Sequence, residues 1–226
     1  MHRLESTTQS RALPWIVTAF AGGIALSAAA LFLRGTGRSG TVTGLLLTAR
    51  WAYGFFWAAY IGGPLTTVFG RKFQPLARRG RELGLAFAAA MLMHVTLVAW
   101  LYHISIHPPL PLGSALFFAV GLGFVYVLAV CSMPALAMRI PPSARRVIFT
   151  TGTEYIAVAF LSDFLKNPFG HGFEHLVAYG PFVTLALLAT LLRLISYAAR
   201  FARRDRPPAT SHTANAVKNF GPPPST

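Results

Sequence analysis

Residues 78–107 read RRGRELGLAFAAAMLMHVTLVAWLYHISIH, and this stretch decides the class of fold. A basic cluster opens it, an apolar run over residues 83–103 follows, and His103 and His107 stand where the run ends. A helix needs about 20 mostly apolar residues to cross the hydrocarbon of a bilayer, so the run predicts a transmembrane helix. His94 lies near its centre, where an ionisable side chain is costly and indicates a candidate functional residue.

Apolar runs of this kind recur along the whole chain. The protein has 226 residues, of which 54% are hydrophobic, and its mean hydropathy is +0.53. The predicted membrane spans are residues 13–33, 44–65, 83–103, 114–136, 147–165 and 180–200. We therefore predict an all-α fold, a polytopic membrane bundle of six transmembrane helices within residues 13–203. Residues 1–12 form a short N-terminal segment, and residues 204–226, rich in Pro, Ser and Thr, form a tail predicted to be disordered.

The first span has a second interpretation. Arg3 and Arg11 precede an apolar segment that contains Ala28-Ala29-Ala30, which is typical of a signal peptide with a small-residue cleavage site. The apolar segment of about 21 residues is longer than the usual signal-peptide core of about 7–15 residues, which favours a retained membrane anchor.

The basic residues are concentrated on one side of the six predicted spans. The residues on the richer side are Arg3, Arg11, Arg71, Lys72, Arg78, Arg79, Arg81, Arg139, Arg145, Arg146, Arg200, Arg203, Arg204, Arg206 and Lys218. Arg34, Arg38 and Lys166 fall on the other side. By the positive-inside rule, both termini are predicted to be cytoplasmic in the inner (plasma) membrane. The net charge of +14 is interpreted as a topology signal and a contact with anionic lipid of the bilayer, and not as a nucleic-acid-binding surface.

Metal-ligating residues are few. The single cysteine, Cys131, lies inside an apolar run, which excludes an intrachain disulfide and a cysteine-based metal cluster. His171 and His175 are weak candidates for a metal site on the outer side, because two histidines four residues apart share a helix face. The alternative is that both are ordinary loop residues.

Four charged residues fall inside predicted spans. Glu154 and Arg193 each lie about seven residues from a cytoplasmic span end, roughly 10 Å deep at 1.5 Å rise per residue. Because consecutive spans are usually neighbours, we predict that Glu154 and Arg193 form an ion pair. Arg50 and Asp163 lie near the outer ends of their spans and are predicted to pair or to reach outward to the interface. Mutual neutralisation is one interpretation of these charges, and a proton relay or a contact with haem propionates is the other.

Several motifs in the middle of the chain occur together in one known family. They are TGLLLTARWAYGFFWAAYIGGPL at 43–65, RELGL at 81–85, His94, LAVCSMPAL at 128–136, the basic pair Arg145-Arg146, and Tyr155. With these motifs, residues 43–165 resemble the ferric-reductase-like transmembrane domain, and are similar to the haem-binding membrane subunit of bacterial periplasmic methionine-sulfoxide reductases. The resemblance implies that His94 is a ligand of a b-type haem. It also implies a separate cytoplasmic electron donor, for which the predicted docking surface is Arg71, Lys72, Arg78, Arg79 and Arg81.

The sequence departs from this family at the other haem ligands. The family's ligand histidines on the fifth helix correspond to Thr151 and Phe164, and neither residue type ligates haem iron. His107 is a weak substitute, because it lies roughly 20 Å beyond His94 and is rotated from it by roughly 140° on a continuous helix. His107 also precedes a proline, which disfavours helical geometry. Two arrangements stay open: haem bound by His94 alone, and haem bound by His94 together with Met91, Met93 or a residue of another helix.

Two classes of function follow from these observations. The first is a transmembrane electron-transfer subunit with haem b and no flavin or nicotinamide site of its own, since the chain has no GxGxxG motif and no P-loop. The second is a divergent, non-catalytic relative that has lost haem and serves as a membrane scaffold or partner subunit. A transporter is a more distant third, because it would carry more intramembrane charge or broken helices in repeated halves.

Overall fold

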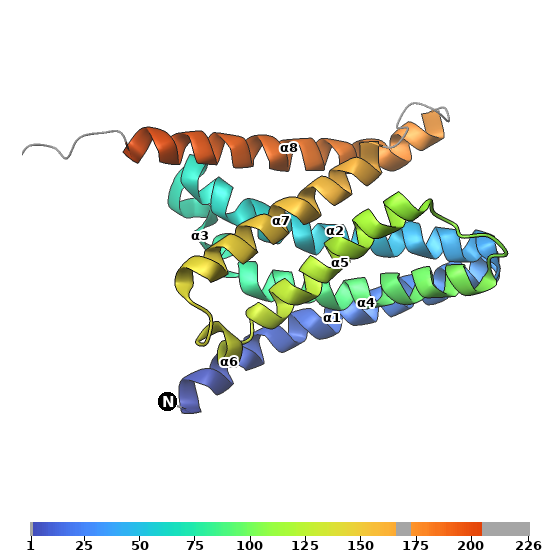
Figure 1. Ribbon diagram of the computed structural model, residues 1–226, viewed down its shortest axis with the longest axis horizontal. Coiled ribbons are helices and arrows are strands. Elements are labelled where there is room, and N and C mark those ends of the chain that lie inside the picture. The colour runs from blue at the N-terminus through green and yellow to red at the C-terminus, as the bar shows by residue number, and fades with distance from the viewer. Residues whose placement is uncertain (1, 166–172, 205–226) are drawn as a thin grey trace, which may run out of the picture.

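The computed structural model describes residues 2–165 and 173–204, and these residues fold into helices joined by short connections (Figure 1). The long helices are α1 (His2–Arg34), α2 (Arg38–Phe69), α4 (Gly80–Ile104), α5 (Leu112–Cys131), α7 (Pro142–Leu165) and α8 (Phe173–Arg204). The short ones are η1 (Gly70–Phe73), α3 (Gln74–Arg78) and α6 (Pro134–Ala137). In the described part of the chain the fold is all-α, as predicted.

Five segments are long and apolar enough to cross a membrane. They are Ala12–Arg34, Gly80–Ile104, Leu112–Cys131, Pro142–Leu165 and Val177–Ala202. The protein is therefore a polytopic helical membrane protein. The sixth long helix, α2, is not among the five, because Arg50 and several Gly, Thr, Trp and Tyr residues lower its hydropathy. It contacts three other long helices, α1, α4 and α8.

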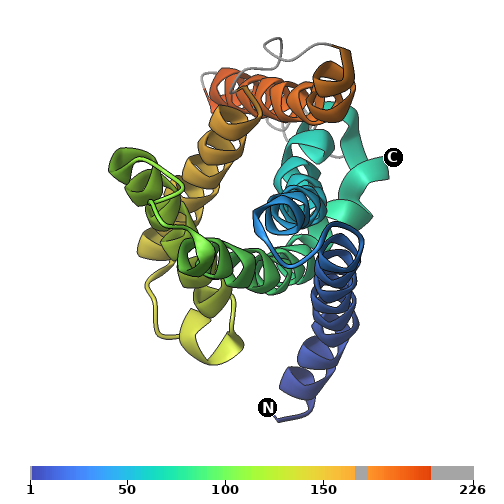
Figure 2. The same cartoon turned by 90° about the vertical axis from the view of Figure 1, so that its right-hand side faces the viewer.

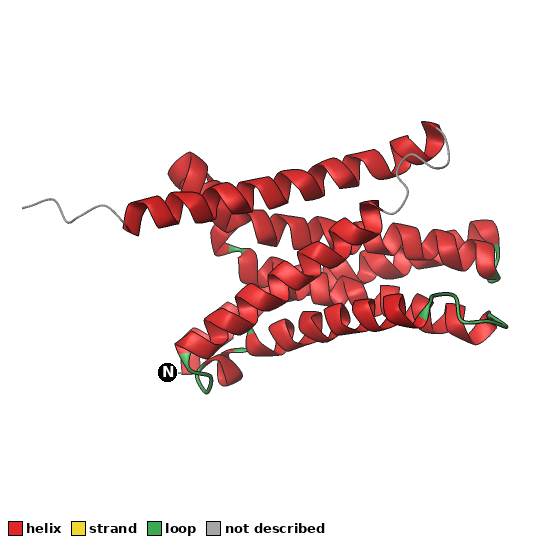
Figure 3. Cartoon of the chain, turned by 45° about the horizontal axis from the view of Figure 1, so that its top comes forward, coloured by secondary structure: helices red, strands yellow, loops and turns green. Residues whose placement is uncertain are grey.

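The helices are arranged as a compact trio and an open arc. Helices α1, α2 and α4 contact one another in all three pairings, whereas α5 contacts α4 and α7, and α7 contacts α8. Helix α8 returns to α2, so α2, α4, α5, α7 and α8 form a ring with α1 outside it (Figure 2). The start of α1, the end of α8, α3 and α6 all lie at one end of the bundle (Figures 1 and 3).

Close packing of α1 against α2 depends on a glycine. A Cβ atom at Gly22 would lie 2.5 Å from the Trp51 ring, which is closer than side-chain atoms can approach. The indole Nε1 of Trp51 donates a hydrogen bond to the carbonyl of Ala19 at 2.8 Å. Small residues that let helices approach closely are the usual basis of helix association in lipid, where burial of apolar surface gives little driving force.

Aromatic side chains from α2, α4, α7 and α8 pack against one another inside the ring of helices. The ring of Phe56 stacks on Phe160 with centroids 5.6 Å apart, and it contacts Phe87 at 5.3 Å. The ring of Phe164 meets Tyr53 edge-on at 4.9 Å. Aromatic pairs at such separations add roughly 0.5–1.5 kcal/mol each beyond the area they bury.

The helix boundaries differ from the prediction mainly after the fourth span. That span was predicted to run to residue 136, but α5 ends at Cys131. Met133 has extended backbone geometry (φ −71°, ψ 134°) because it precedes Pro134, whose ring disfavours a helical preceding residue. Pro134 then begins the separate short helix α6. The first and last helices are longer than predicted and extend beyond their apolar cores.

Candidate functional site

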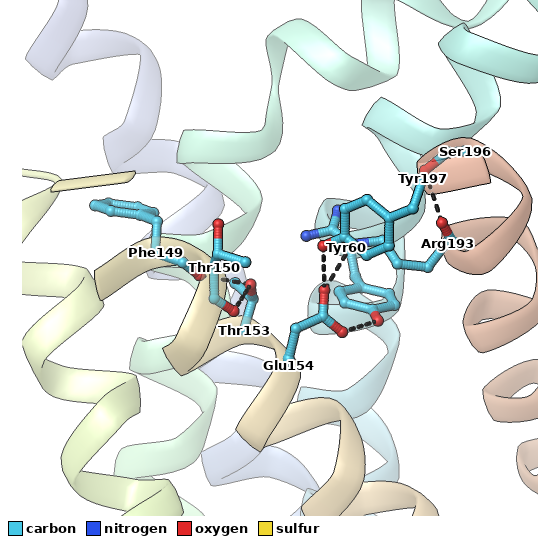
Figure 4. A network of polar contacts seen from close by, with 8 residues as sticks. All are labelled: Tyr60, Phe149, Thr150, Thr153, Glu154, Arg193, Ser196 and Tyr197. Carbon is cyan, nitrogen blue, oxygen red and sulfur yellow. Dashed lines mark hydrogen bonds and ion pairs between the residues drawn. The ribbon is translucent and has the colours of Figure 1, made fainter. Parts of the chain in front are cut away.

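A carboxylate with three hydrogen-bond donors lies between α2, α7 and α8. Arg193 Nε lies 2.8 Å from Glu154 Oε1 and forms the ion pair that the sequence predicted. The hydroxyl of Tyr60 donates to Glu154 Oε2 at 2.7 Å, and the hydroxyl of Tyr197 donates to Oε1 at 2.8 Å (Figure 4). We call these four residues the Glu154 cluster.

The aromatic rings of the cluster also hold the guanidinium. Arg193 Cζ lies 4.8 Å from the ring centroid of Tyr60 and 5.3 Å from that of Tyr197. The side chains of Arg193 and Glu154 are 20% and 35% exposed, so the pair is partly open. Tyr197 is four residues after Arg193 on α8 and therefore shares its helix face, a signal that sequence reasoning could have used. Tyr60 lies on α2, 94 residues before Glu154 in the sequence, so only the fold brings these two side chains together.

A large cavity lies beside the Glu154 cluster, within the ring of helices. Its volume is about 1180 Å³, and its lining comes from α2, α4, α5, α6, α7 and α8. Ligand pockets usually span about 300–1,000 Å³, so this space exceeds that of a drug-sized molecule. Tyr60 and Arg193 of the cluster form part of its wall.

The charged lining of the cavity is basic. The four ionised residues in the wall are Arg81, Arg145, Arg146 and Arg193, and none of the described lining residues is Asp or Glu. Arg81 is half-buried and its Nε donates to the carbonyl of Ser132 at 2.9 Å. Arg145 and Arg146 are exposed in the first turns of α7. The site therefore combines a positive rim with a mostly apolar interior.

His94, the predicted haem ligand, is half-buried on α4 and forms a hydrogen bond with a side chain of α2. Its Nδ1 lies 3.1 Å from Thr48 Oγ1, and the same hydroxyl lies 2.8 Å from the carbonyl of Gly44. A threonine hydroxyl has one proton, which the Gly44 carbonyl accepts. In the tautomer that is protonated on Nδ1, His94 donates to Thr48 and Nε2 carries the lone pair.

The residues around His94 do not fit a bis-histidine haem site. Thr151, at one expected ligand position, is exposed on α7 and does not face the interior. Phe164, at the other, is 2% exposed and packed against Tyr53, Phe160 and Phe182. No histidine is found among the described residues that line the cavity.

The other candidate ligands do not come together. His107 is exposed beyond the end of α4, where Ser105 has extended geometry, so the pre-proline prediction is confirmed. His171 and the side chain of His175 lie outside the described residues. Within the described part of the chain, no group of three or more His, Cys, Asp or Glu residues could hold a metal ion.

Arg50 is held by the start of α8. Its Nη2 donates to the carbonyl of Ala178 at 2.7 Å, and its Cζ lies 5.2 Å from the Tyr179 ring centroid and 5.0 Å from that of Phe182. The predicted pairing of Arg50 with Asp163 stays a prediction.

The five basic residues predicted to bind an electron donor divide into two groups. Arg71, Lys72 and Arg78 are exposed around η1 and α3. Arg79 lies over the Trp15 ring of α1, with Cζ 5.8 Å from its centroid, and Arg81 faces the cavity. Arg79 is exposed like the first three residues, so the exposed surface for an acidic partner consists of Arg71, Lys72, Arg78 and Arg79.

The chain matches no protein-family model, no curated protein and no solved structure.

Proposed function

We propose that this protein is a six-span plasma-membrane protein with cytoplasmic termini, in which packing has replaced the bis-histidine haem site of the ferric-reductase-like bundle. It serves as a non-catalytic scaffold or partner subunit. The observation that carries this proposal is the buried ring of Phe164 at a ligand position, packed among aromatic side chains of α2, α7 and α8.

Thr151 supports the same conclusion. It is exposed on α7, so a ligand at that position would point away from the interior. Without two axial ligands from facing helices, the bundle lacks the ligation that holds a low-spin b-type haem in a membrane. The exposed residues Arg71, Lys72, Arg78 and Arg79 would then serve a protein partner that is not an electron donor.

An optical spectrum tests the proposal. Protein purified from haem-replete cells is expected to be folded and to have no Soret band. A Soret band that His94→Ala abolishes, and that His103→Ala leaves intact, would overturn it. His103 is the matched control because it lies on the same helix and is exposed.

A single-ligand haem protein is the second candidate, and the hydrogen bond between His94 and Thr48 favours it. Histidines that bind metals usually donate their second ring N–H to an acceptor, which fixes the ring and the tautomer. Bound haem would supply one-electron redox chemistry. Arg71, Lys72, Arg78 and Arg79 would then hold the predicted electron donor. The optical spectrum described above separates the two candidates.

The proposed topology requires α2 to cross the membrane despite its lower hydropathy. Alkaline phosphatase is active only outside the cytoplasm, so fusions after residue 36 and after residue 72 test this directly. Activity at 36 and none at 72 is expected. Equal activity at both positions would show that α2 does not span the bilayer.

A further inference from the structure

The cavity beside the Glu154 cluster has the composition of a lipid site and not of a site for a small polar solute. Its walls include Val125, Leu128 and Ile156, and its lining is mostly apolar. Its volume of about 1180 Å³ exceeds the usual range for small-molecule pockets, about 300–1,000 Å³. A long apolar chain would fill such walls without leaving polar groups unpaired.

The charged residues of the cavity wall favour an anionic ligand. Glu154 already pairs with Arg193, so three arginines of the wall remain without a carboxylate in the lining: Arg81, Arg145 and Arg146. Arginine binds phosphate with two parallel N–H donors, which makes it suited to phosphate recognition. Arg145 and Arg146 also lie in the first turns of α7, where the helix dipole favours negative charge.

The position of these arginines matches the level of lipid headgroups. The start of α7, which carries Arg145 and Arg146, lies at the end of the bundle that holds the start of α1 and the end of α8 (Figure 1). The apolar walls of α5 and α7 extend from that end toward the middle of the bundle. A molecule with a phosphate group and acyl chains would match both the arginines at the rim of the cavity and its apolar walls. Basic pockets between transmembrane helices on the cytoplasmic side are a known form of anionic-lipid site.

We propose that this cavity binds one anionic glycerophospholipid of the inner leaflet, with its phosphate at Arg145 and Arg146 and its acyl chains along α5 and α7. Arg81 is a second contact for the headgroup, because it lines the same cavity and its Nε is fixed by a hydrogen bond to the carbonyl of Ser132. The proposal is independent of whether His94 binds haem.

Native mass spectrometry of the detergent-purified full chain tests this site. Dioleoyl phosphatidylglycerol is the probe, and dioleoyl phosphatidylcholine is the zwitterionic control. The variant Arg145→Gln/Arg146→Gln is expected to bind phosphatidylglycerol roughly 30-fold more weakly, since each basic residue near an anionic lipid contributes about 1 kcal/mol. The matched control Arg71→Gln/Lys72→Gln removes equal charge from an exposed surface at the same end of the bundle and should bind like wild type.

A cavity-filling variant keeps the proposal testable if the double variant does not fold. Ala129→Trp places a large ring in the cavity without changing charge, and it is expected to remove the bound lipid. Equal losses in both double variants would overturn the site in favour of general surface electrostatics. Equal binding of phosphatidylcholine, unchanged binding by Ala129→Trp, or full displacement by inorganic phosphate would each overturn an anionic phospholipid as the ligand.

Discussion

The Glu154 cluster joins three helices at one carboxylate, and charge removal tests how much this contact stabilises the bundle. Breaking a fully buried ion pair costs about 3–5 kcal/mol. Here the side chains of Arg193 and Glu154 are 20% and 35% exposed, so solvent screening reduces that cost. We expect Glu154→Gln and Arg193→Gln each to lower the free energy of unfolding by about 2 kcal/mol.

The double variant shows whether the two side chains act together. Glu154→Gln/Arg193→Gln leaves no unpaired charge, so we expect a total loss of about 2.5 kcal/mol and a coupling energy of about 1.5 kcal/mol. Tyr60→Phe should cost about 0.6 kcal/mol, the average for a side-chain hydrogen bond inside a membrane. Unfolding in mixed micelles of increasing SDS content, followed by circular dichroism, measures all four variants.

Ser162→Ala is the control for this cycle, because its hydroxyl bonds only to the carbonyl of Val158 on the same helix among the contacts described. It should change stability by less than about 0.5 kcal/mol. If the stability losses of Glu154→Gln and Arg193→Gln add up to the loss of the double variant within about 0.5 kcal/mol, the two side chains are not coupled and the reasoning fails.

Four further substitutions test the packing and one hydrogen bond. In the same unfolding assay, Gly22→Ala should destabilise the protein by about 1–3 kcal/mol, because the added Cβ would clash with the Trp51 ring. Gly54→Ala is the control: its added Cβ would have nothing within 4 Å, so it should be neutral or stabilising by up to about 1 kcal/mol. Phe164→Ala should cost about 3 kcal/mol by emptying the aromatic core, and wild-type stability would show that the core tolerates the void. Thr48→Val should cost about 1 kcal/mol, because His94 loses its hydrogen-bond partner on α2. The unfolding midpoint measures this loss.

The all-helical membrane architecture and the ion pair between Glu154 and Arg193 could be predicted, because both follow from where residues lie along individual helices. Apolar length indicated the membrane helices, and depth from the span ends brought Glu154 and Arg193 to one level. The end of α5 could also have been predicted, since Pro134 restricts Met133 in any sequence context. The error there came from giving apolar length more weight than proline geometry.

The cavity and the surroundings of His94 could not be predicted, because they depend on how helices rotate and separate. The sequence does not say that Thr151 faces outward or that Phe164 packs on Phe182. Nor does it show that α5 and α7 stand away from α2 and leave a space whose wall includes Arg81. Each of these facts requires the relative placement of helices distant along the chain.

The separation of the bundle into a compact trio and an open arc has a consequence for its synthesis. Helices α1, α2 and α4 are the first long helices to leave the ribosome, and they contact one another in every pairing. They can assemble while α5 and α7 are still being inserted. The ring closes only when α8, the last helix, reaches α2. A nascent chain halted before α8 would hold a finished three-helix subassembly with a gap on one side, and surrounding lipid would have access to that gap until translation ends.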